Sequence, residues 1–516
     1  KHQQVLIAKS TITTIHSFCL EIIKENFHML DLDPAFRIAD DSVEIEMLKE
    51  ELIEALFDDI YEEIYGEEPT PRAQALERLL DAYGGNRNDR ELTGIILKIQ
   101  RQCMNEADPL GWLERAAEIW EEGRETDFAR TPQGEKILEI TEDSFREYLT
   151  RMEEGLEIIR GDEGLTGYEK CFVEEIAFLQ DGLKIIETGT WDGLSRHVGD
   201  FTFQRLGTAK RTADPENKDF VKGIRDELKK EHEKLADSFF TGTSQEMFQE
   251  LGELRNHLGD IVLIVKEFMA AFREEKKKLG LIDFNDMEHF ALELFRDETN
   301  GLGEKYQARF REIYIDEYQD SNRVQETILT AVSRMKADPA ENNMFMVGDL
   351  KQSIYGFRKA DPTLFKEKLK TYRKDEQAKE RLIALNRNFR SRKEVIEGAN
   401  DIMSALMSDK VGDIDYVGDE RLEFGAAYYG EIDRIAPGID LELMDKADKG
   451  EELDDVENER LESLRIAGRI QEMVDGAYPV WDGESKCFRP AQYRDFAILM
   501  RSVKGFDTFL EEELVR

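Results

Sequence analysis

The sequence predicts an α/β fold that combines a large all-helical region with a parallel sheet. Between residues 40 and 275, apolar residues such as Leu48, Leu52 and Leu56 recur every four positions, a spacing typical of amphipathic helices. From residue 276 onward, short apolar runs alternate with helical patterns, and this alternation is typical of parallel sheets. The two patterns of apolar residues predict separate helical and sheet-containing domains.

Length and composition exclude several classes of protein. A chain of 516 residues is long enough for two or three domains. No run approaches the ~20 apolar residues of a membrane helix and no secretory signal is visible, so we expect a cytoplasmic protein without a membrane partner. The four cysteines are far apart, which predicts reduced thiols and no zinc or iron–sulfur site. A formal charge of −41 argues against a general basic surface for nucleic acid but allows a local basic channel.

Helices and strands are predicted along the chain from local patterns. The stretch "STITTIHSFCLEIIKENF" (10–27) predicts the end of a strand and the start of a helix. In the helical region, the clearest helix carries an apolar face from Leu258 to Phe272 and ends in a lysine run before Gly280. Later helices are predicted from Ser321 to Val332 and through Val395 and Ala399. Strands are predicted at 312–317, 344–349, 382–386, 439–445 and 494–501.

Asp316 and Glu317 follow the first of the later strands, in "IYIDEYQDSN" (313–322). Ligands bind at the carboxyl ends of parallel strands, so this position favours a site. One carboxylate there can hold Mg²⁺, and its neighbour can orient or deprotonate a water that attacks a phosphate. The alternative is an exposed acidic turn that caps the next helix, which is the commoner meaning of such a motif on its own.

Two further polar clusters, "VGDLKQSIYGFRKADPTLF" (347–365) and "LNRNFRS" (385–391), also follow predicted strands. Gln352 can hydrogen-bond a phosphate oxygen, while Arg358 and Arg390 offer guanidinium groups to phosphate. Three aromatic residues can stack on bases: Tyr355, Phe357 and Phe389. Three polar clusters at strand ends are hard to explain as surface turns.

These clusters resemble motifs II, III and IV of the UvrD/Rep-like superfamily 1 DNA helicases. "TIHSFC" (14–19) is similar to motif Ib, and "LIDFNDM" (281–287) is similar to the segment before motif II. Within the family, Lys351, "KADPTLF" (359–365) and "ENFHMLDLDPAFRIAD" (25–40) are most similar to AddA-type helicase–nuclease subunits. The resemblance implies a P-loop NTPase fold, with RecA-like parallel-sheet motor domains and a helical insertion.

The resemblance also implies domain boundaries. Residues 1–39 would form part of the first motor domain, and residues 40–275 would be the helical insertion. Residues 276–380 would continue the first motor domain, and residues 381–516 would begin the second. No G-x-x-x-x-G-K-[ST] motif occurs in the chain, so we expect an interior piece of a longer protein that is inactive by itself.

For ATP, the resemblance assigns Asp316 to Mg²⁺ and Glu317 to the catalytic base. Gln352 would sense the γ-phosphate, with Arg358 nearby. Phe389 would stack on the adenine, and Arg390 would reach the γ-phosphate as an arginine finger, a role that its charge also favours.

For DNA, the resemblance assigns Tyr355 and Phe357 to stacking on single-stranded bases. Thr14, His16 and Ser17 would contact DNA through motif Ib. The alternative for His16 and Ser17 is a histidine at a strand end followed by a serine helix cap, and the sequence favours neither reading.

The implied activity is that of an ATP- and Mg²⁺-dependent DNA helicase subunit in a helicase–nuclease complex that processes double-strand breaks for recombinational repair. It would act on single-stranded and duplex-end DNA with an AddB-like partner, and the intact protein would carry exonuclease activity. The alternatives are a UvrD-like repair helicase without a nuclease and an ATPase-dead scaffold. Intact Asp316, Glu317, Gln352 and Arg390 argue against the scaffold.

Overall fold

The computed structural model divides into two compact units, which are described separately. The first comprises Lys1–Ile315, Ser321–Phe345 and Tyr355–Asp361, and the second comprises Asp316–Asp320, Met346–Ile354 and Pro362–Arg516. The structure describes residues 10–30, 32–39, 42–66, 68–84, 89–118, 127–335, 342–412, 414–426, 428, 438–443, 458–504 and 506–515. None of the helices in these ranges is both long and apolar enough to cross a membrane.

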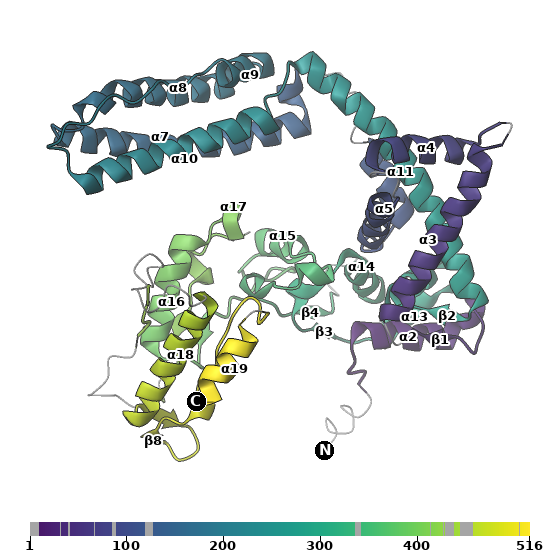
Figure 1. The fold of residues 1–516 in the computed structure, drawn as a ribbon. Coiled ribbons are helices and arrows are strands. Elements are labelled where there is room, and N and C mark those ends of the chain that lie inside the picture. The colour runs from purple at the N-terminus through teal and green to yellow at the C-terminus, as the bar shows by residue number, and fades with distance from the viewer. Residues whose placement is uncertain are drawn as a thin grey trace. The chain divides into compact units, whose positions relative to one another are not determined.

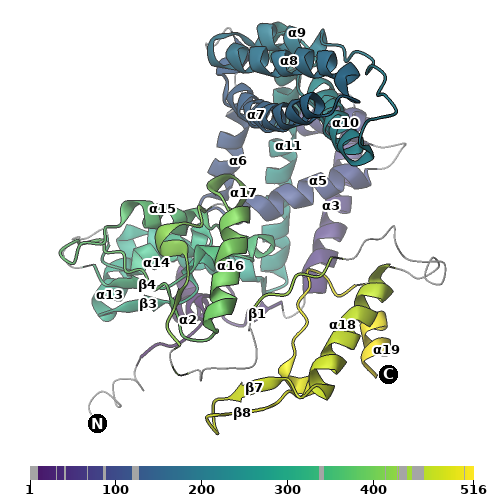
Figure 2. The same cartoon turned by 90° about the vertical axis from the view of Figure 1, so that its left-hand side faces the viewer.

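A helical bundle forms one hydrophobic core of the first unit, and its helices lie side by side in Figure 1 and Figure 2. Its helices are α7 (Pro132–Gly161), α8 (Glu169–Thr188), α9 (Trp191–Gly199) and α10 (Pro215–Ser238). Thr131 starts α7 by accepting a hydrogen bond from the Gly134 amide, and Pro132 occupies the first turn. The fully buried Phe172 and Trp191 fill the core.

One ion pair is enclosed in this bundle. Arg225 and Glu175 are each 2% exposed, and the Arg225 Nη2 lies 2.5 Å from the Glu175 Oε1. The same nitrogen donates to the Gln204 carbonyl oxygen at 2.6 Å. Burial raises the pKa of Glu175 although Arg225 opposes the shift. Each charge therefore depends on the other for its stabilisation.

A second core joins four helices to the C-terminal part of a long helix. The helices are α3 (Ser42–Ile64), α4 (Pro71–Tyr83), α5 (Arg90–Cys103) and α6 (Pro109–Glu118), and the long helix is α11 (Ser244–Lys278). Of the residues predicted to form the apolar face of α11, Val265 and Phe272 are buried in this core, and Val262 and Met269 are partly buried against it. Ile264 and Phe268 are also fully buried here, although they were not part of the predicted face. A capping box between Thr243 and Glu246 begins this helix.

A third core brings together helices from both sides of the long helical stretch. They are α2 (Ile15–Asn26), α12 (Phe284–Arg296), α13 (Leu302–Arg309) and α14 (Arg323–Val332). The strands beside them are β1 (Arg37–Ile38), β2 (Leu281–Ile282), β3 (Ile313–Ile315) and β4 (Met344–Met346). β1 is parallel to β2, and β3 is hydrogen-bonded to β4.

The second unit contains shorter elements. Its helices are α15 (Thr363–Thr371), α16 (Lys393–Leu406), α17 (Asp409–Gly412), α18 (Asn458–Asp475) and α19 (Asp507–Val515). Its strands are β5 (Arg387–Asn388), β6 (Glu423–Phe424), β7 (Pro479–Asp482) and β8 (Cys487–Pro490). β5 and β6 are parallel, and β7 and β8 are antiparallel.

Single turns of 3₁₀ helix occur in both units. They are η1 (Phe27–Met29), η2 (Phe128–Arg130), η3 (Thr166–Tyr168), η4 (Glu298–Asn300), η5 (Tyr318–Asp320), η7 (Leu350–Gln352), η8 (Gly356–Arg358), η9 (Gly418–Glu420) and η10 (Tyr493–Asp495). Three of them, η5, η7 and η8, lie within the motifs that the sequence assigns to the site.

Several predicted strands are wrong. Residues 382–386 and 494–501 contain no strand, and neither does 439–443, while residues 444 and 445 lie outside the described ranges. Apolar runs are present, but a strand also requires hydrogen bonds to a neighbouring strand. Leu385 is 84% exposed and Leu499 is 93% exposed, so these apolar side chains are not packed in a sheet. Each sheet in the described part of the chain accordingly has two strands.

Candidate active site

The chain turns sharply after β3, and this turn sets the two predicted carboxylates. Asp316 and Glu317 are exposed, whereas Tyr318 and Gln319 are buried in η5. Glu317 has a φ of 50°, in the left-handed region that a non-glycine residue seldom adopts. Its amide donates to the Asp316 Oδ1 at 3.1 Å. The turn therefore presents both carboxylates at the surface while its next two residues anchor it.

Gln319 connects this turn to the segment after β4. Its Nε2 donates to the Glu317 Oε2 at 2.7 Å, and its Oε1 accepts from the Asp349 amide at 3.0 Å. A Cβ added to Gly348 would lie 2.5 Å from the Gln319 Oε1. Glycine at 348 therefore allows the close approach that this connection requires.

Asp349 extends the connection to Gln352. Its Oδ2 accepts from the Gln352 Nε2 at 2.9 Å, and its Oδ1 lies 2.9 Å from the Lys351 Nζ. Burial opposes ionisation of Asp349, but hydrogen bonds from Lys351 and Gln352 outweigh it and lower the pKa of this carboxyl. A continuous set of hydrogen bonds thus runs through Glu317, Gln319, Asp349 and Gln352, here called the motif II–III network.

Asp320 lies beside this network and was not selected from the sequence. Burial, and then the charge of Glu317, raise the pKa of Asp320. Its buried Oδ1 has no hydrogen-bond partner among the described residues. Burial and the neighbouring Glu317 therefore make the Asp320 carboxyl a weaker acid than an ordinary aspartate.

Phe389 and Arg390 lie in the loop after β5. The Arg390 amide donates to the Asn388 Oδ1 at 2.8 Å, and the Tyr428 hydroxyl donates to the Phe389 carbonyl oxygen at 2.5 Å. Phe389 is 58% exposed, and its ring covers Gly425, where an added Cβ would lie 2.7 Å from the ring. These contacts hold an aromatic surface beside an arginine. They do not include the motif II–III network, so convergence of Arg390 on Glu317 stays a prediction.

The residues predicted to stack on DNA bases belong to the first unit. The rings of Tyr355 and Phe357 lie 5.8 Å apart at 49°, and Phe357 is 78% exposed. Arg358 ends η8, and its side chain lies outside the described part of the structure. Lys359 follows with a φ of 76°, and burial lowers the pKa of its amine. An exposed aromatic pair is therefore available at this loop.

The motif Ib residues make local contacts at the start of α2. Thr14, not Ser17, caps the helix: its Oγ1 accepts from the Ser17 amide at 3.3 Å. The His16 Nε2 lies 3.1 Å from the buried carboxylate of Glu288. This carboxylate also accepts from Gln325 at 2.7 Å. His16 and Thr14 thus have structural contacts, and their role in DNA binding stays a prediction.

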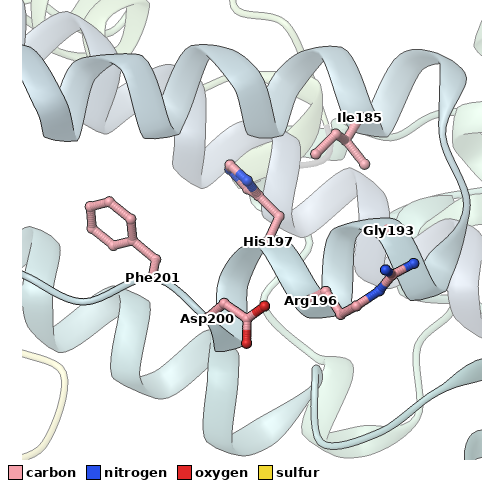
Figure 3. A pocket seen from close by; sticks show the side chains of 6 residues that line it. All are labelled: Ile185, Gly193, Arg196, His197, Asp200 and Phe201. Atoms are coloured by element: carbon pink, nitrogen blue, oxygen red, sulfur yellow. The ribbon is translucent and has the colours of Figure 1, made fainter.

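A separate, open pocket lies in the helical bundle, away from every predicted site residue in sequence (Figure 3). It is lined by Ile185, Gly193, Arg196, His197, Asp200 and Phe201. The His197 ring stacks on Phe178 with centroids 4.6 Å apart, and its Nε2 lies 2.9 Å from the Phe178 carbonyl oxygen. The histidine is thus part of the bundle's packing, and we assign no chemistry to this pocket.

Sequence reasoning missed Gln319, Asp349 and the contacts of Lys351. All three stand within the quoted motifs, so their position in the motif was the available signal. Gln319 meets Asp349 across 30 residues of chain and Lys351 meets Glu420 across 69, and spacing alone does not give those contacts.

Comparison with known proteins adds two findings. A family model described as the UvrD/REP helicase N-terminal domain matches residues 1–373. Curated relatives, each named as the A subunit of an ATP-dependent helicase/nuclease, match throughout the chain. The relative from Clostridium novyi is 35% identical and is matched over 100% of this chain and 42% of its own length. The relative from Acetivibrio thermocellus is 36% identical, over 100% of this chain and 43% of its own length. The chain therefore spans less than half the length of these relatives.

Proposed function

Because this chain belongs to the UvrD/REP helicase family, we propose that it carries the ATP-hydrolysing residues of a DNA translocase of the helicase–nuclease type. The observation that supports this is the motif II–III network. It places an exposed carboxylate, Glu317, and an amide side chain, Gln352, in one hydrogen-bonded set at the ends of two paired strands. Ligand sites in sheet proteins of this class lie at such strand ends.

Glu317 acts as the base in this proposal. Gln319 holds one of its carboxylate oxygens, and the side chain is exposed to water. Glu317 accepts a proton from the attacking water while the water oxygen bonds to the γ-phosphorus and the bond to the leaving ADP oxygen breaks. Positioned proton transfer of this kind contributes roughly 10²–10⁴-fold to a rate.

Asp316 fits the role of a Mg²⁺ ligand. Mg²⁺ usually keeps several waters and takes one or two protein carboxylates together with substrate phosphates, and Asp316 is an exposed carboxylate next to Glu317. When bound, the ion neutralises charge that develops on the β- and γ-phosphate oxygens. The Asp316 Oδ1 also accepts from the Glu317 amide, which fixes the side chain at the turn.

Gln352 links the nucleotide to DNA. A γ-phosphate that accepts a hydrogen bond from the Gln352 side-chain amide competes with Asp349 for that amide. Asp349 is joined to Glu317 through Gln319, so a change at Gln352 occurs close to the proposed base. Tyr355 and Phe357, which follow Gln352 closely in sequence, stack on single-stranded bases, and Arg358 is next to them in the chain. Phe389 stacks on the adenine, and Arg390 stabilises the transferred phosphoryl group.

The family fold is that of P-loop NTPases, and we extend it to RecA-like motor domains with the boundaries 1–39, 40–275, 276–380 and 381–516. The parallel pairing of Arg37 with Leu281 supports an insertion, because it joins the two sides of residues 40–275. The third core gives the same support, since it combines Phe18 with Ile282 and Met287.

The complete protein would use ATP to unwind duplex DNA ends and move along single strands during double-strand break repair. The relatives are named as one subunit of an enzyme, which supports a second subunit, and we propose that it is of the AddB type. The relatives are also named as a nuclease. The motifs of this chain account only for nucleotide hydrolysis and DNA contact, so we assign the nuclease activity to other residues of the complete protein.

Phosphate release by the full-length protein, with and without single-stranded DNA, tests the proposal. Glu317→Gln should keep ATP binding and lower turnover by roughly 10²-fold or more. Glu312→Gln is the matched control, because Glu312 is an exposed carboxylate near β3 outside the network. Absence of DNA-stimulated turnover in the wild type, or equal turnover in Glu317→Gln, would contradict the proposal.

A further inference from the structure

We propose that Lys351 is a positioning residue that fixes the Gln352 end of the motif II–III network relative to the strand pair carrying Phe389 and Arg390. The inference rests on the proposed function, because it assigns Lys351 a part in the same hydrolysis. Three observations carry it: the contacts of the lysine, the connection of its partner to β6, and the pairing of β6 with β5.

Lys351 lies between two carboxylates. Its Nζ is 2.9 Å from the Asp349 Oδ1 and 2.7 Å from the Glu420 Oε2, and its side chain is only 19% exposed. Burial disfavours the charged amine, but Glu420 and Asp349 outweigh burial and raise the pKa of Lys351. The amine therefore stays protonated at neutral pH and keeps both carboxylates in place.

Glu420 lies close in sequence to the strand that pairs with β5, which precedes the loop carrying Phe389 and Arg390. It ends η9, three residues before β6, which is parallel to β5. The Glu423 amide donates to the Asn386 carbonyl oxygen at 2.8 Å, and the Gly425 amide donates to the Asn388 carbonyl oxygen at 2.9 Å. Asn388 in turn holds the Arg390 amide. The ion pair between Lys351 and Glu420 thus connects Asp349, the partner of Gln352, to the strand pair that precedes Phe389 and Arg390.

The charge of Lys351, and not only its bulk, is required by this arrangement. Asp349 and Glu420 share the same amine, so a neutral residue at 351 would leave two partly buried carboxylates facing each other without a cation between them. Their repulsion would move the turn at 418–420 away and release Asp349 from its fixed orientation. Gln352 would then lose the partner that orients its amide.

A matched lysine provides a control. Lys374 pairs with Asp419, the neighbour of Glu420, but Lys374 is largely exposed and the pair is separate from Asp349. It holds the same turn from the surface without joining the motif II–III network. A general loss of order in the turn would affect Lys374→Met and Lys351→Met alike, whereas the proposed role belongs to Lys351 alone.

The test uses the full-length protein and DNA-stimulated phosphate release. Lys351→Met should lower kcat by about tenfold, which corresponds to about 1.4 kcal/mol, with little change in KM for ATP. Lys351→Arg should retain most of the activity, and Lys374→Met should stay within about twofold of wild type. Lys351→Glu should be the most impaired, and adding Glu420→Lys should recover about tenfold, because the new lysine can pair with both Asp349 and the new glutamate.

Amide hydrogen exchange gives an arm that needs no turnover. Lys351→Met should speed exchange at residues 387–391, whereas Lys374→Met, which releases only the surface pair of the turn, should leave exchange at 387–391 unchanged. If the wild-type protein shows no DNA-stimulated hydrolysis, the proposed function is wrong. Faster hydrogen exchange in Lys351→Met would still support the positioning role of Lys351 in that case. Unchanged exchange in Lys351→Met would overturn it, and so would a charge swap that restores nothing.

Discussion

Replacing Gln319 with leucine should separate Glu317 from Asp349 without removing either residue. Gln319 is 1% exposed, so leucine keeps most of the volume and removes only the amide. The Asp349 amide loses its acceptor, which costs about 1–3 kcal/mol where water cannot replace it. The lost hydrogen bond to the Glu317 carboxylate is worth about 1.5–3 kcal/mol, but water reaches that exposed group and offsets much of the loss.

We therefore expect Gln319→Leu to lower the free energy of unfolding by about 2 kcal/mol and kcat by at least about tenfold, because Glu317 is no longer oriented. Urea unfolding and phosphate release by the full-length protein measure the two effects. Gln307→Leu is the control, since Gln307 donates to the Ala331 carbonyl oxygen at 2.9 Å outside the network. It should lower stability slightly and leave kcat unchanged. A destabilised Gln319→Leu protein with wild-type kcat would refute the orienting role.

Three other changes have expected outcomes. Phe357→Ala should weaken single-strand binding by about 1–3 kcal/mol through lost stacking, measured by fluorescence titration, and should leave DNA-independent ATP turnover intact. Burial lowers the pKa of His232 below its ordinary 6.5, so its stabilisation is complete above pH 6.5 and declines as the pH falls toward the folded pKa. Urea unfolding at pH 7 and pH 5 should therefore show a smaller pH dependence for His232→Phe than for wild type. Arg225→Met should lower the free energy of unfolding by about 3–5 kcal/mol, and adding Glu175→Leu should recover most of it, because the unpaired buried carboxylate causes the loss.

The family could be predicted from the sequence. Motif residues have fixed types, so "DEYQD" and "GDLKQSIYGFR" remain readable, and the match over residues 1–373 confirms the predicted resemblance to UvrD/Rep-like helicases. The predicted strands before Asp316 and before Asp349 are also present, as β3 and β4. Apolar runs that end in polar clusters are a local signal, and this signal was sufficient there.

The contacts within the site could not be predicted. The bond between Gln319 and the Asp349 amide, and the pairing of Lys351 with Glu420, depend on how distant segments meet. The strand predicted at 382–386 is absent for the same reason: backbone hydrogen bonds join Leu382 to Arg373 and Asn386 to Glu423, but the residues form no continuous ladder with another segment. His16 was selected from the sequence as a DNA contact, but its side chain lies next to the buried carboxylate of Glu288.

The left-handed backbone at Glu317 lowers stability at the position where the proposed function needs a carboxylate. A φ of 50° costs a residue with a Cβ roughly 1–2 kcal/mol, a penalty that glycine avoids. At the position proposed for the catalytic base, the residue with the lowest conformational energy is therefore glycine, which has no side chain to accept a proton. Selection for heat resistance alone is expected to favour glycine or asparagine at 317 and to yield more stable proteins that lack the proposed catalytic base. Laboratory evolution of this protein would need an activity screen at every round to keep the glutamate.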